Sequence, residues 1–413
     1  VPVVLFDLPA RDGDPNGIAT KAIAQLAKLN PAPLAMRERA ALIQPANYDQ
    51  HLEELRSCDL LIEAIAERPD WKAALYERVT PYIGDRAILA TNTSGLSLGS
   101  LAESVPESLR SRFCGIHFFN PPRYMALVEL IPGPNTNPAI LDLLETFLVS
   151  TLGKGVVRAK DTPNFVANRI GVFSMAVAIH YTAAFGLRLD LVDALTGPAI
   201  GRAKSATYRT ADIVGLDTMS HVFEGSALAL RNDPWRHYFN SPAWLKALIE
   251  KGALGQKTGA GIYTDKGKQV LDPATGTYQA AGAKPDEAVH AILKIRNPAE
   301  KFAALRASEH PQAQFLWAIH RDIFHYAAVL LAEIADTARD VDFAIRWGFG
   351  WSMGPFEIWQ AAGWKQVTTW IEDDIAAGKA TAVRTPRLRA SRIWQRCRSS
   401  APDCWGLARR PPG

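Results

Sequence analysis

The chain has 413 residues, of which 48% are hydrophobic and 21% are charged, the composition of a globular protein large enough for two or three domains. No apolar run approaches the roughly 18 residues that a membrane-spanning helix needs, and the first residues do not have the pattern of a signal peptide. The formal net charge is +4, but residues 384–413 hold eight arginines and one aspartate, so the rest of the chain carries −3. A nucleic-acid-binding surface is therefore not expected.

The four cysteines are scattered through the chain, without the spacing of a metal site or of a disulfide framework. They are Cys58, Cys114, Cys397 and Cys404. We therefore expect reduced thiols, a cytoplasmic protein and no bound metal. Cys114 is predicted to be a buried structural thiol.

Residues 3–7, VVLFD, form an apolar run that ends in an acid. In a dinucleotide-binding fold the second strand ends in this way, and its carboxylate bonds the adenosine ribose, which favours NAD over NADP. Any strand followed by a turn aspartate would have the same pattern. The first strand of such a fold and its GxGxxG turn, which holds the pyrophosphate, are not found in this sequence. We therefore expect that about 20 to 30 residues are missing at the N-terminus, which would leave two strands with unpaired edges.

Residues 16–44 are predicted to form two helices, and residues 59–67 and 87–94 two buried strands. A helix between these strands, residues 70–83, is predicted to begin at Asp70 as its N-cap. The second strand opens into Thr91, Asn92, Thr93 and Ser94, at the strand end where ligands bind in this fold, although such residues are also common in ordinary turns. A helix at 138–151 and a strand at 155–157 complete the predicted sheet.

Residues 115–133, GIHFFNPPRYMALVELIPG, contain two apolar runs separated by a Pro-Pro break. Both runs are predicted to be short buried strands. Glu129 lies in the middle of the second run, and a lone carboxylate in a buried strand is costly unless it has a partner. His117, in the first run, is the nearest candidate. A glutamate that accepts from one imidazole nitrogen makes the other nitrogen a better proton acceptor, so this pair is half of a catalytic unit. Two unrelated polar residues at strand ends are the alternative.

Residues 161–163 interrupt the sheet pattern. The second domain is predicted to start near Asn164, with a long amphipathic helix from Phe165. The remaining chain reads as helices with one internal repeat: LVDALTGPAIGR from Leu191 and DVDFAIRWGFGWSMGPFEIW from Asp340 share a Val-Asp helix that leads into a Gly-rich turn. The region 311–380 is therefore predicted to be a second copy of one helical module. From about residue 381 the chain loses its apolar periodicity, which fits a basic interaction tail, a translated frameshift or a fragment end.

Four motifs occur in order: TNTSGLS, HFFNPP, VELIPG and KDTPNFVANRI. Together they resemble the 3-hydroxyacyl-CoA dehydrogenase family, and the resemblance extends from about Val3 to about Lys379. It implies a doubly wound Rossmann-type α/β domain followed by all-helical C-terminal domains in tandem. It also implies NAD as cofactor, an acyl-CoA substrate and the oxidation of (3S)-3-hydroxyacyl-CoA in fatty acid beta-oxidation.

The resemblance also implies roles for individual residues. His117 would be the general base, supported by Glu129, while Ser94 and Asn168 would hold the substrate oxygen. Residues 16–44 would form a helical hairpin over the CoA moiety. Arg169 would be structural. The residues implied to bind the cofactor are Asp7, Ala64, Glu67, Lys72, Asn92, Ser94, Asn120 and Lys257, and those implied to bind the CoA substrate are Lys21, Lys28, Ser94 and Asn168.

We therefore expect an incomplete NAD-binding domain at residues 1–160, helical domains at 161–300 and 301–380, and a basic tail at 381–413. Larger relatives of this family imply a fused or associated enoyl-CoA hydratase or thiolase, and either a monomer or a homodimer. Two alternatives stay open: a related NAD-dependent hydroxyacid dehydrogenase, and an inactive fragment or a protein that binds CoA esters without turnover.

Overall fold

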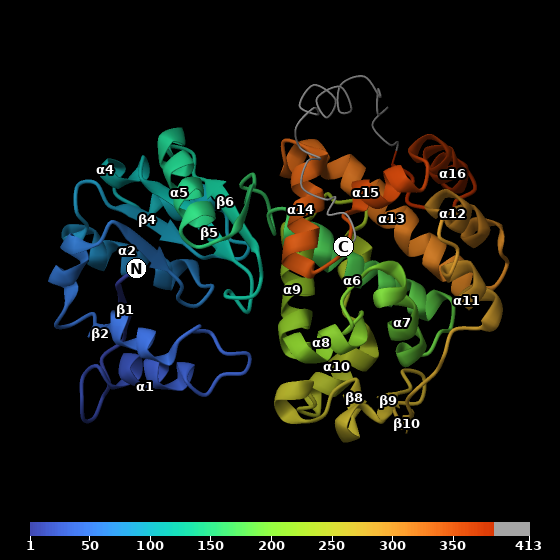
Figure 1. Cartoon of the computed structure of the whole chain (residues 1–413), viewed down its shortest axis with the longest axis horizontal. Coiled ribbons are helices and arrows are strands. Elements are labelled where there is room, and N and C mark those ends of the chain that lie inside the picture. Colours follow the sequence, from blue (N-terminus) through green and yellow to red (C-terminus); the bar gives the residue numbers. More distant parts are fainter. Residues whose placement is uncertain (384–413) are drawn as a thin grey trace, which may run out of the picture. The chain divides into compact units, whose positions relative to one another are not determined.

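The computed structural model describes residues 1–383 and divides into two compact units, Val1–Val166 and the chain from Ala167 onward (Figure 1). The first unit is α/β and the second is mainly helical, which confirms the predicted fold class. The predicted tail lies almost wholly outside the described residues. No helix in the described part of the chain is long and apolar enough to cross a membrane.

The main sheet of the first unit has five strands in the order β3-β4-β5-β6-β7. All neighbours are parallel except β5 and β6, which are antiparallel. The strands are β3 (Leu60–Glu63), β4 (Ile88–Thr91), β5 (Phe113–Phe118), β6 (Leu127–Pro132) and β7 (Gly155–Arg158). All five strands predicted in this region exist, and the predicted strands 59–67 and 87–94 are shorter than expected. Their last residues belong to the turns that carry the polar groups.

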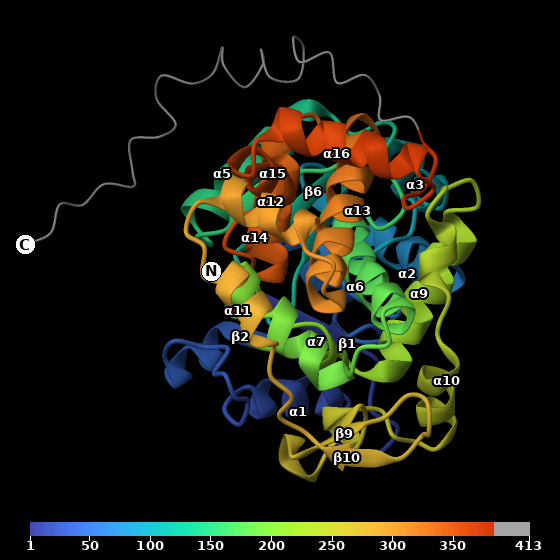
Figure 2. The same cartoon turned by 90° about the vertical axis from the view of Figure 1, so that its right-hand side faces the viewer.

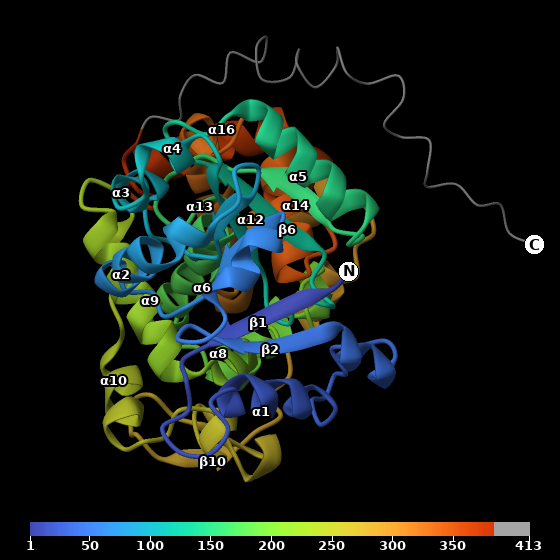
Figure 3. The ribbon, with the colours of Figure 1, turned by 90° about the vertical axis from the view of Figure 1, so that its left-hand side faces the viewer.

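A separate two-stranded parallel sheet lies beside helix α1 (Gly17–Leu26) and consists of β1 (Val3–Asp7) and β2 (Ile43–Asn47) (Figure 3). Among the described residues β1 pairs only with β2, and β3 pairs only with β4. The prediction of two strands with unpaired edges is therefore confirmed. Apolar side chains on these strands, Val3 and Ile62, remain 46% and 42% exposed.

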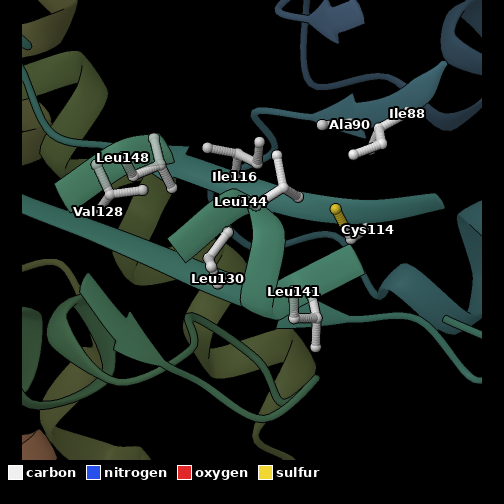
Figure 4. Packing of buried hydrophobic residues seen from close by; sticks show 9 residues of the cluster. All are labelled: Ile88, Ala90, Cys114, Ile116, Val128, Leu130, Leu141, Leu144 and Leu148. Atoms are coloured by element: carbon white, nitrogen blue, oxygen red, sulfur yellow. The ribbon is translucent and has the colours of Figure 1, made fainter. Parts of the chain in front are cut away.

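The main core of the first unit lies between the five-stranded sheet and helix α5 (Pro138–Ser150). Figure 4 shows Leu141, Leu144 and Leu148 on this helix together with apolar side chains of β4, β5 and β6. The spacing of these leucines places them on one helix face. Asn137 caps the helix through its side chain, which accepts the backbone N–H of Ala139. Helix α5 thereby covers part of one face of the sheet.

Cys114 lies in this core, as predicted for a structural thiol. Burial raises the pKa of its thiol to about 12, so the nucleophilic thiolate is disfavoured.

Two helix predictions in the first unit are wrong in detail. The second half of the predicted hairpin is only a 3-10 helix, η1 (Arg37–Leu42), because the chain that follows it pairs with β1 as strand β2. Pro45 in that strand also disfavours a helical residue before it. Helix α2 (Pro69–Val79) begins one residue before Asp70, with proline as its first residue, and Asp70 bonds the Arg68 side chain instead of capping the helix.

Helices α6 (Ala167–Ala184) and α13 (Pro311–Ile334) form the centre of the second unit, where they pack against each other (Figure 2). The rings of Phe173 and Tyr326 stack across this contact at 3.7 Å. Arg169 is buried, donates to the Tyr326 hydroxyl at 2.6 Å and pairs with Asp233 at 2.9 Å, in agreement with its predicted structural role. Helix α6 begins at Ala167, not at Phe165 as predicted, because Asn164 and Phe165 have left-handed backbones.

Shorter helices and one small sheet surround this centre. They are α7 (Leu189–Thr196), α8 (Tyr208–Val214), α9 (Leu216–Ala229), α10 (Ala243–Glu250), α11 (Glu287–Leu293), α12 (Pro298–Ala307), α14 (Ala338–Phe349), α15 (Pro355–Ala361), α16 (Trp364–Ala376) and the antiparallel strands β8 (Tyr263–Thr264), β9 (Gln269–Leu271) and β10 (Tyr278–Ala280). The separation of two helical domains near residue 300 stays a prediction.

The internal repeat corresponds to a repeated structural device. Asp193 on α7 accepts the backbone N–H groups of residues 207, 208 and 209, at the start of α8. At the equivalent position on α14, Asp342 accepts the N–H of Phe356 at the start of α15. In each copy a buried aspartate thus satisfies the otherwise unpaired amides of the next helix. The turns that follow the two repeat helices also touch, since Ser352 N–H donates to the Gly201 carbonyl at 2.8 Å.

Asp342→Asn and Asp193→Asn should each make stability less dependent on pH. Burial raises the pKa of Asp342 to about 8 and that of Asp193 to about 6. A carboxyl group with a raised pKa holds its proton in the folded state after the unfolded chain has released it, so rising pH disfavours the folded state between the two pKa values. We expect the unfolding free energy of Asp342→Asn, measured relative to that of wild type, to increase as the pH rises from about 4 to about 8.

For Asp193→Asn the same gain should be complete near pH 6, because the pKa of this carboxyl is raised less. Denaturant unfolding of both variants and wild type at several pH values measures the two windows. A difference from wild type that does not change with pH would show that these carboxyl groups are ionised in the folded protein.

Candidate active site

His117 and Glu129 are directly opposite each other on the antiparallel strands β5 and β6. The imidazole Nδ1 lies 2.8 Å from the Glu129 carboxylate, and both side chains are buried. Directly opposed residues point to the same face of a sheet, so the pairing register alone brings the two side chains together. The contact expected from the two apolar runs is present in the structure.

The surroundings of Glu129 decide which nitrogen of His117 carries the proton. One carboxylate oxygen faces His117 Nδ1, and the other accepts the backbone N–H of Val166 at 3.1 Å. An ionised carboxylate only accepts hydrogen bonds, so Nδ1 must donate. The neutral imidazole is therefore held in the tautomer whose Nε2 has a lone pair available for a proton.

Aromatic and amide groups fix the end of strand β5. The His117 ring lies 4.4 Å from the ring of Phe119 and 5.7 Å from that of Phe165, measured between centroids. The side chain of Asn92 accepts the backbone N–H of Phe118 at 3.0 Å. Asn92 therefore joins the ends of β4 and β5, and its predicted contact with the cofactor stays a prediction. Asn120, two residues beyond the strand, is exposed.

The polar turn after β4 is organised by Glu67. One oxygen of its carboxylate accepts the Thr93 hydroxyl at 2.5 Å and the backbone N–H groups of Ser94 and Gly95 at 2.8 and 3.2 Å. Ser94 itself is exposed. Because β4 and β5 are parallel, this turn and His117 lie at the same edge of the sheet. The edge therefore combines a proton acceptor with hydroxyl and amide groups.

A buried ion pair lies next to Glu67, the residue that organises this turn. Lys72 is fully buried, and its ammonium lies 2.7 Å from the Glu63 carboxylate and 3.6 Å from that of Glu67. Glu63 also accepts the hydroxyls of Tyr76 and Thr91 at 2.9 and 2.8 Å. Lys72 thus acts on two carboxylates of the protein, and its predicted contact with the nicotinamide ribose stays a prediction.

The remaining predicted site residues occupy several elements. Asp7 ends β1, and its carboxylate accepts the backbone N–H of Leu8 at 2.7 Å. Ala64 follows β3 and is exposed. Lys21 on α1 and Lys28 just after it are also exposed.

Two predicted residues belong to the second unit. Asn168 is the second residue of α6 and is half-buried. Lys257 pairs with Asp217, with its ammonium 2.6 and 2.7 Å from the two carboxylate oxygens. The ammonium of Lys257 is therefore paired with a carboxylate of the same unit.

Three contributors were missed by the sequence predictions: the Tyr76 hydroxyl, the Thr91 hydroxyl as a partner of Glu63, and the backbone N–H of Val166. The pairing of Glu63 with Lys72 had one available signal, a buried strand carboxylate followed by a helix with a lysine in its first turn. The Val166 amide had none, since a backbone group has no sequence signature.

The chemistry of these strand ends suits a nicotinamide dinucleotide. A carboxylate at the end of β1, another four residues after β3, and hydroxyl and amide groups after β4 are of the kind that bonds ribose hydroxyls and a carboxamide. Asp7, Glu67 and the turn at 93–95 would hold it.

Family comparison agrees with this arrangement. Residues 1–162 match the 3-hydroxyacyl-CoA dehydrogenase NAD binding domain, and residues 165–265 match the 3-hydroxyacyl-CoA dehydrogenase C-terminal domain. The chain belongs to the 3-hydroxyacyl-CoA dehydrogenase family. Its first unit is the NAD-binding domain of that family, which confirms NAD as the cofactor expected from the sequence.

Relatives extend the match beyond these two regions. A probable 3-hydroxyacyl-CoA dehydrogenase of Bacillus subtilis is 39% identical over 357 residues, which are 86% of this chain and 45% of that protein. A putative fatty acid oxidation complex trifunctional enzyme of Rickettsia felis is 33% identical over 88% of this chain and 51% of its own length. The chain thus spans about half the length of these relatives. The crystal structure of 3-hydroxybutyryl-CoA dehydrogenase from Escherichia coli K12 shares the fold, with a TM-score of 0.71 at 21% identity, over 96% of this chain and 94% of that one.

Lys72→Met should strongly destabilise the first unit of this family member. The substitution leaves the buried carboxylate of Glu63 without its cation, and breaking a buried pair in this way costs about 3–5 kcal/mol. The double variant Glu63→Gln, Lys72→Met should recover a large part of the loss, because it removes both charges. Denaturant unfolding of the two variants measures this coupling.

Lys21→Met, at an exposed lysine, is the control and should change the unfolding free energy by less than about 0.5 kcal/mol. If the single and double variants lost equal stability, the pairing of Lys72 with Glu63 would not be the reason for the loss.

Proposed function

We propose that this protein catalyses the reversible, NAD-dependent oxidation of a (3S)-3-hydroxyacyl-CoA to the 3-oxoacyl-CoA. The observation that carries the proposal is the buried contact between His117 Nδ1 and Glu129, which leaves Nε2 as the ring nitrogen able to accept a proton. Family membership supplies the substrate class. The E. coli enzyme with the same fold is named for 3-hydroxybutyryl-CoA, a short member of that class.

His117 takes the proton of the substrate 3-hydroxyl on Nε2 as the C3–O bond becomes a carbonyl. The hydride leaves C3 at the same time, and bound NAD supplies its acceptor. The imidazole gains a positive charge in this step, and the buried carboxylate of Glu129 stabilises that charge at 2.8 Å. In the reverse direction the imidazolium returns the proton to the carbonyl oxygen. The side chains of the protein therefore transfer the proton, and the hydride goes to the cofactor.

The other polar groups would position the reactants. Ser94, exposed in the turn that Glu67 organises, and Asn168, in the first turn of α6, would bond the substrate oxygen. Asp7 would bond the adenosine ribose and select NAD over NADP. Exposed Lys21 and Lys28 would pair with CoA phosphates. Ala64, Lys72, Asn92, Asn120 and Lys257 complete the proposed cofactor-binding set.

The proposed pathway is fatty acid beta-oxidation, in agreement with the name of the Rickettsia relative. That name also supports the proposal of a fused or associated enoyl-CoA hydratase or thiolase. A monomer or homodimer and a cytoplasmic location stay predictions.

Binding of CoA esters without turnover is the second candidate. It is favoured by the absence of a GxGxxG turn from these 413 residues, since such a turn holds the pyrophosphate of the dinucleotide. Both candidates require CoA-ester binding, and only the first requires hydride transfer.

His117→Gln should lower the turnover number for acetoacetyl-CoA with NADH by about 10²- to 10⁴-fold, because the variant lacks the proton-transfer group. The loss of NADH absorbance measures the rate. Two forms should be assayed: the chain of 413 residues, and the same chain extended at its N-terminus by a strand and a GxGxxG turn. His221→Gln, at an exposed histidine on α9, is the matched control and should leave the rate unchanged.

Turnover retained in His117→Gln would remove His117 from the mechanism. No turnover in either wild-type form, with acetoacetyl-CoA binding intact in a calorimetric titration, would favour the binding protein over the enzyme.

A further inference from the structure

We propose that residues 161–166 form a clamp that positions His117 and Glu129, and that Asn164 is the positioning residue on which the clamp depends. The clamp lies entirely in the first unit. Its importance for catalysis rests on the proposed function, but its effect on the geometry of His117 does not.

The backbone of the clamp has an unusual conformation. Asn164 and Phe165 are consecutive and have positive φ angles of 65° and 52°. This left-handed region is unfavourable for residues other than glycine, is tolerated best by asparagine and aspartate, and is rare for a bulky residue such as phenylalanine. Two such residues in succession persist only where surrounding contacts compensate for them, and they are often found at functional sites.

The compensating contacts lead directly to the catalytic pair. The amide after the left-handed residues, that of Val166, donates to Glu129 Oε1 at 3.1 Å. The Phe165 ring is fully buried and lies 5.7 Å from the His117 ring. One turn of backbone therefore orients the carboxylate through a hydrogen bond and restricts the imidazole through a ring contact. Glu129 is thereby held at the oxygen that His117 does not use.

The other end of the clamp reaches the turn that carries Ser94. Asp161 accepts the backbone N–H groups of Leu98 and Gly99, both at 2.8 Å, at the start of helix α3 (Leu98–Glu103). A Cβ atom at Gly95 would lie 3.1 Å from the side-chain oxygen of Asn164, which leaves almost no room for a larger residue there. The six residues of the clamp thus touch the elements on both sides of the proposed substrate oxygen site.

A short segment with these contacts acts as a common support. It fixes Glu129 and His117 at one end and the helix after Ser94 at the other, so a change in its backbone shifts both together. The left-handed backbone at Asn164 is what directs the Val166 amide toward Glu129. Replacing Asn164 by a residue that avoids this conformation should therefore disturb His117 without touching it.

Asn164→Val tests the clamp, because a β-branched residue is strongly disfavoured in the left-handed region. Labelling the histidines with ¹⁵N gives a readout that does not require activity: the resonance of the His117 Nδ1–H proton, assigned by its loss in His117→Gln. We expect Asn164→Val to shift or abolish this resonance and to lower turnover by about 10²-fold, as expected for a misplaced catalytic group. Asn164→Gly, which allows the left-handed backbone, should retain both.

Lys266→Val is the matched control. Lys266 is exposed, lies in the second unit and has a φ of 54°, so the substitution imposes a similar backbone cost away from the site. It should leave the His117 resonance and turnover unchanged. If Asn164→Val does not fold, Asn164→Ala imposes the same kind of cost with a smaller side chain, and the same resonance is measured.

A folded Asn164→Val or Asn164→Ala protein with an unchanged resonance would overturn the clamp. So would loss of the resonance in Asn164→Gly, because the side chain rather than the backbone conformation would then be responsible. The variants could show the expected resonance changes while the wild-type protein has no turnover. That result would support the clamp and contradict the proposed function alone.

Discussion

The buried contact between His117 and Glu129 constrains the rest of the first unit. Glu129 is completely buried, and a carboxylate in that position is costly unless it is hydrogen-bonded. Its partners come from the opposite strand and from the backbone of residue 166, so the register of β5 and β6 and the path of the chain after β7 must both be correct. A register shift of one residue would place the two side chains on opposite faces of the sheet. The register that pairs β5 with β6 is therefore also the condition for the proposed catalytic contact between His117 and Glu129.

The same physical device recurs through the chain. Side-chain carboxyl groups accept backbone N–H groups where a helix or turn begins: Glu67 at the Ser94 turn, Asp161 at α3, Asp193 at α8 and Asp342 at α15. Each bond satisfies amides that have no partner inside their own helix or turn. These contacts join segments far apart in the sequence, which gives the small elements around the site and in the helical repeat their fixed orientation.

The features that could be predicted from the sequence depend on local pattern. Apolar runs bounded by proline, glycine and polar turns indicated the strands of the main sheet, and a charged residue inside such a run indicated that Glu129 needed a partner. The repeat was also visible, because Val-Asp and the Gly-rich turn recur in order. Family motifs then supplied the roles of the residues.

Other features depend on tertiary contacts that leave no pattern. The sequence carried a signal for the pairing of Lys72 with Glu63, but a lysine near the start of a helix normally faces water, so its complete burial was not predicted. The second of the two helices predicted within residues 16–44 is only a 3-10 helix followed by strand β2, because pairing with β1 outweighed helix propensity. The left-handed pair at Asn164 and Phe165 displaced the start of α6, and nothing in Asn-Phe identifies it in advance.

The division into two units separates the proposed catalytic tasks. The proton acceptor, its supporting carboxylate and the amide that holds this carboxylate all lie in Val1–Val166. These three groups therefore belong to one compact unit. Asn168 and Lys257 belong to the second unit, so their proposed roles concern the holding of substrate and cofactor. It follows that proton transfer is the part of the proposed reaction that this structure supports in atomic detail, because all of its protein groups share a single folded framework.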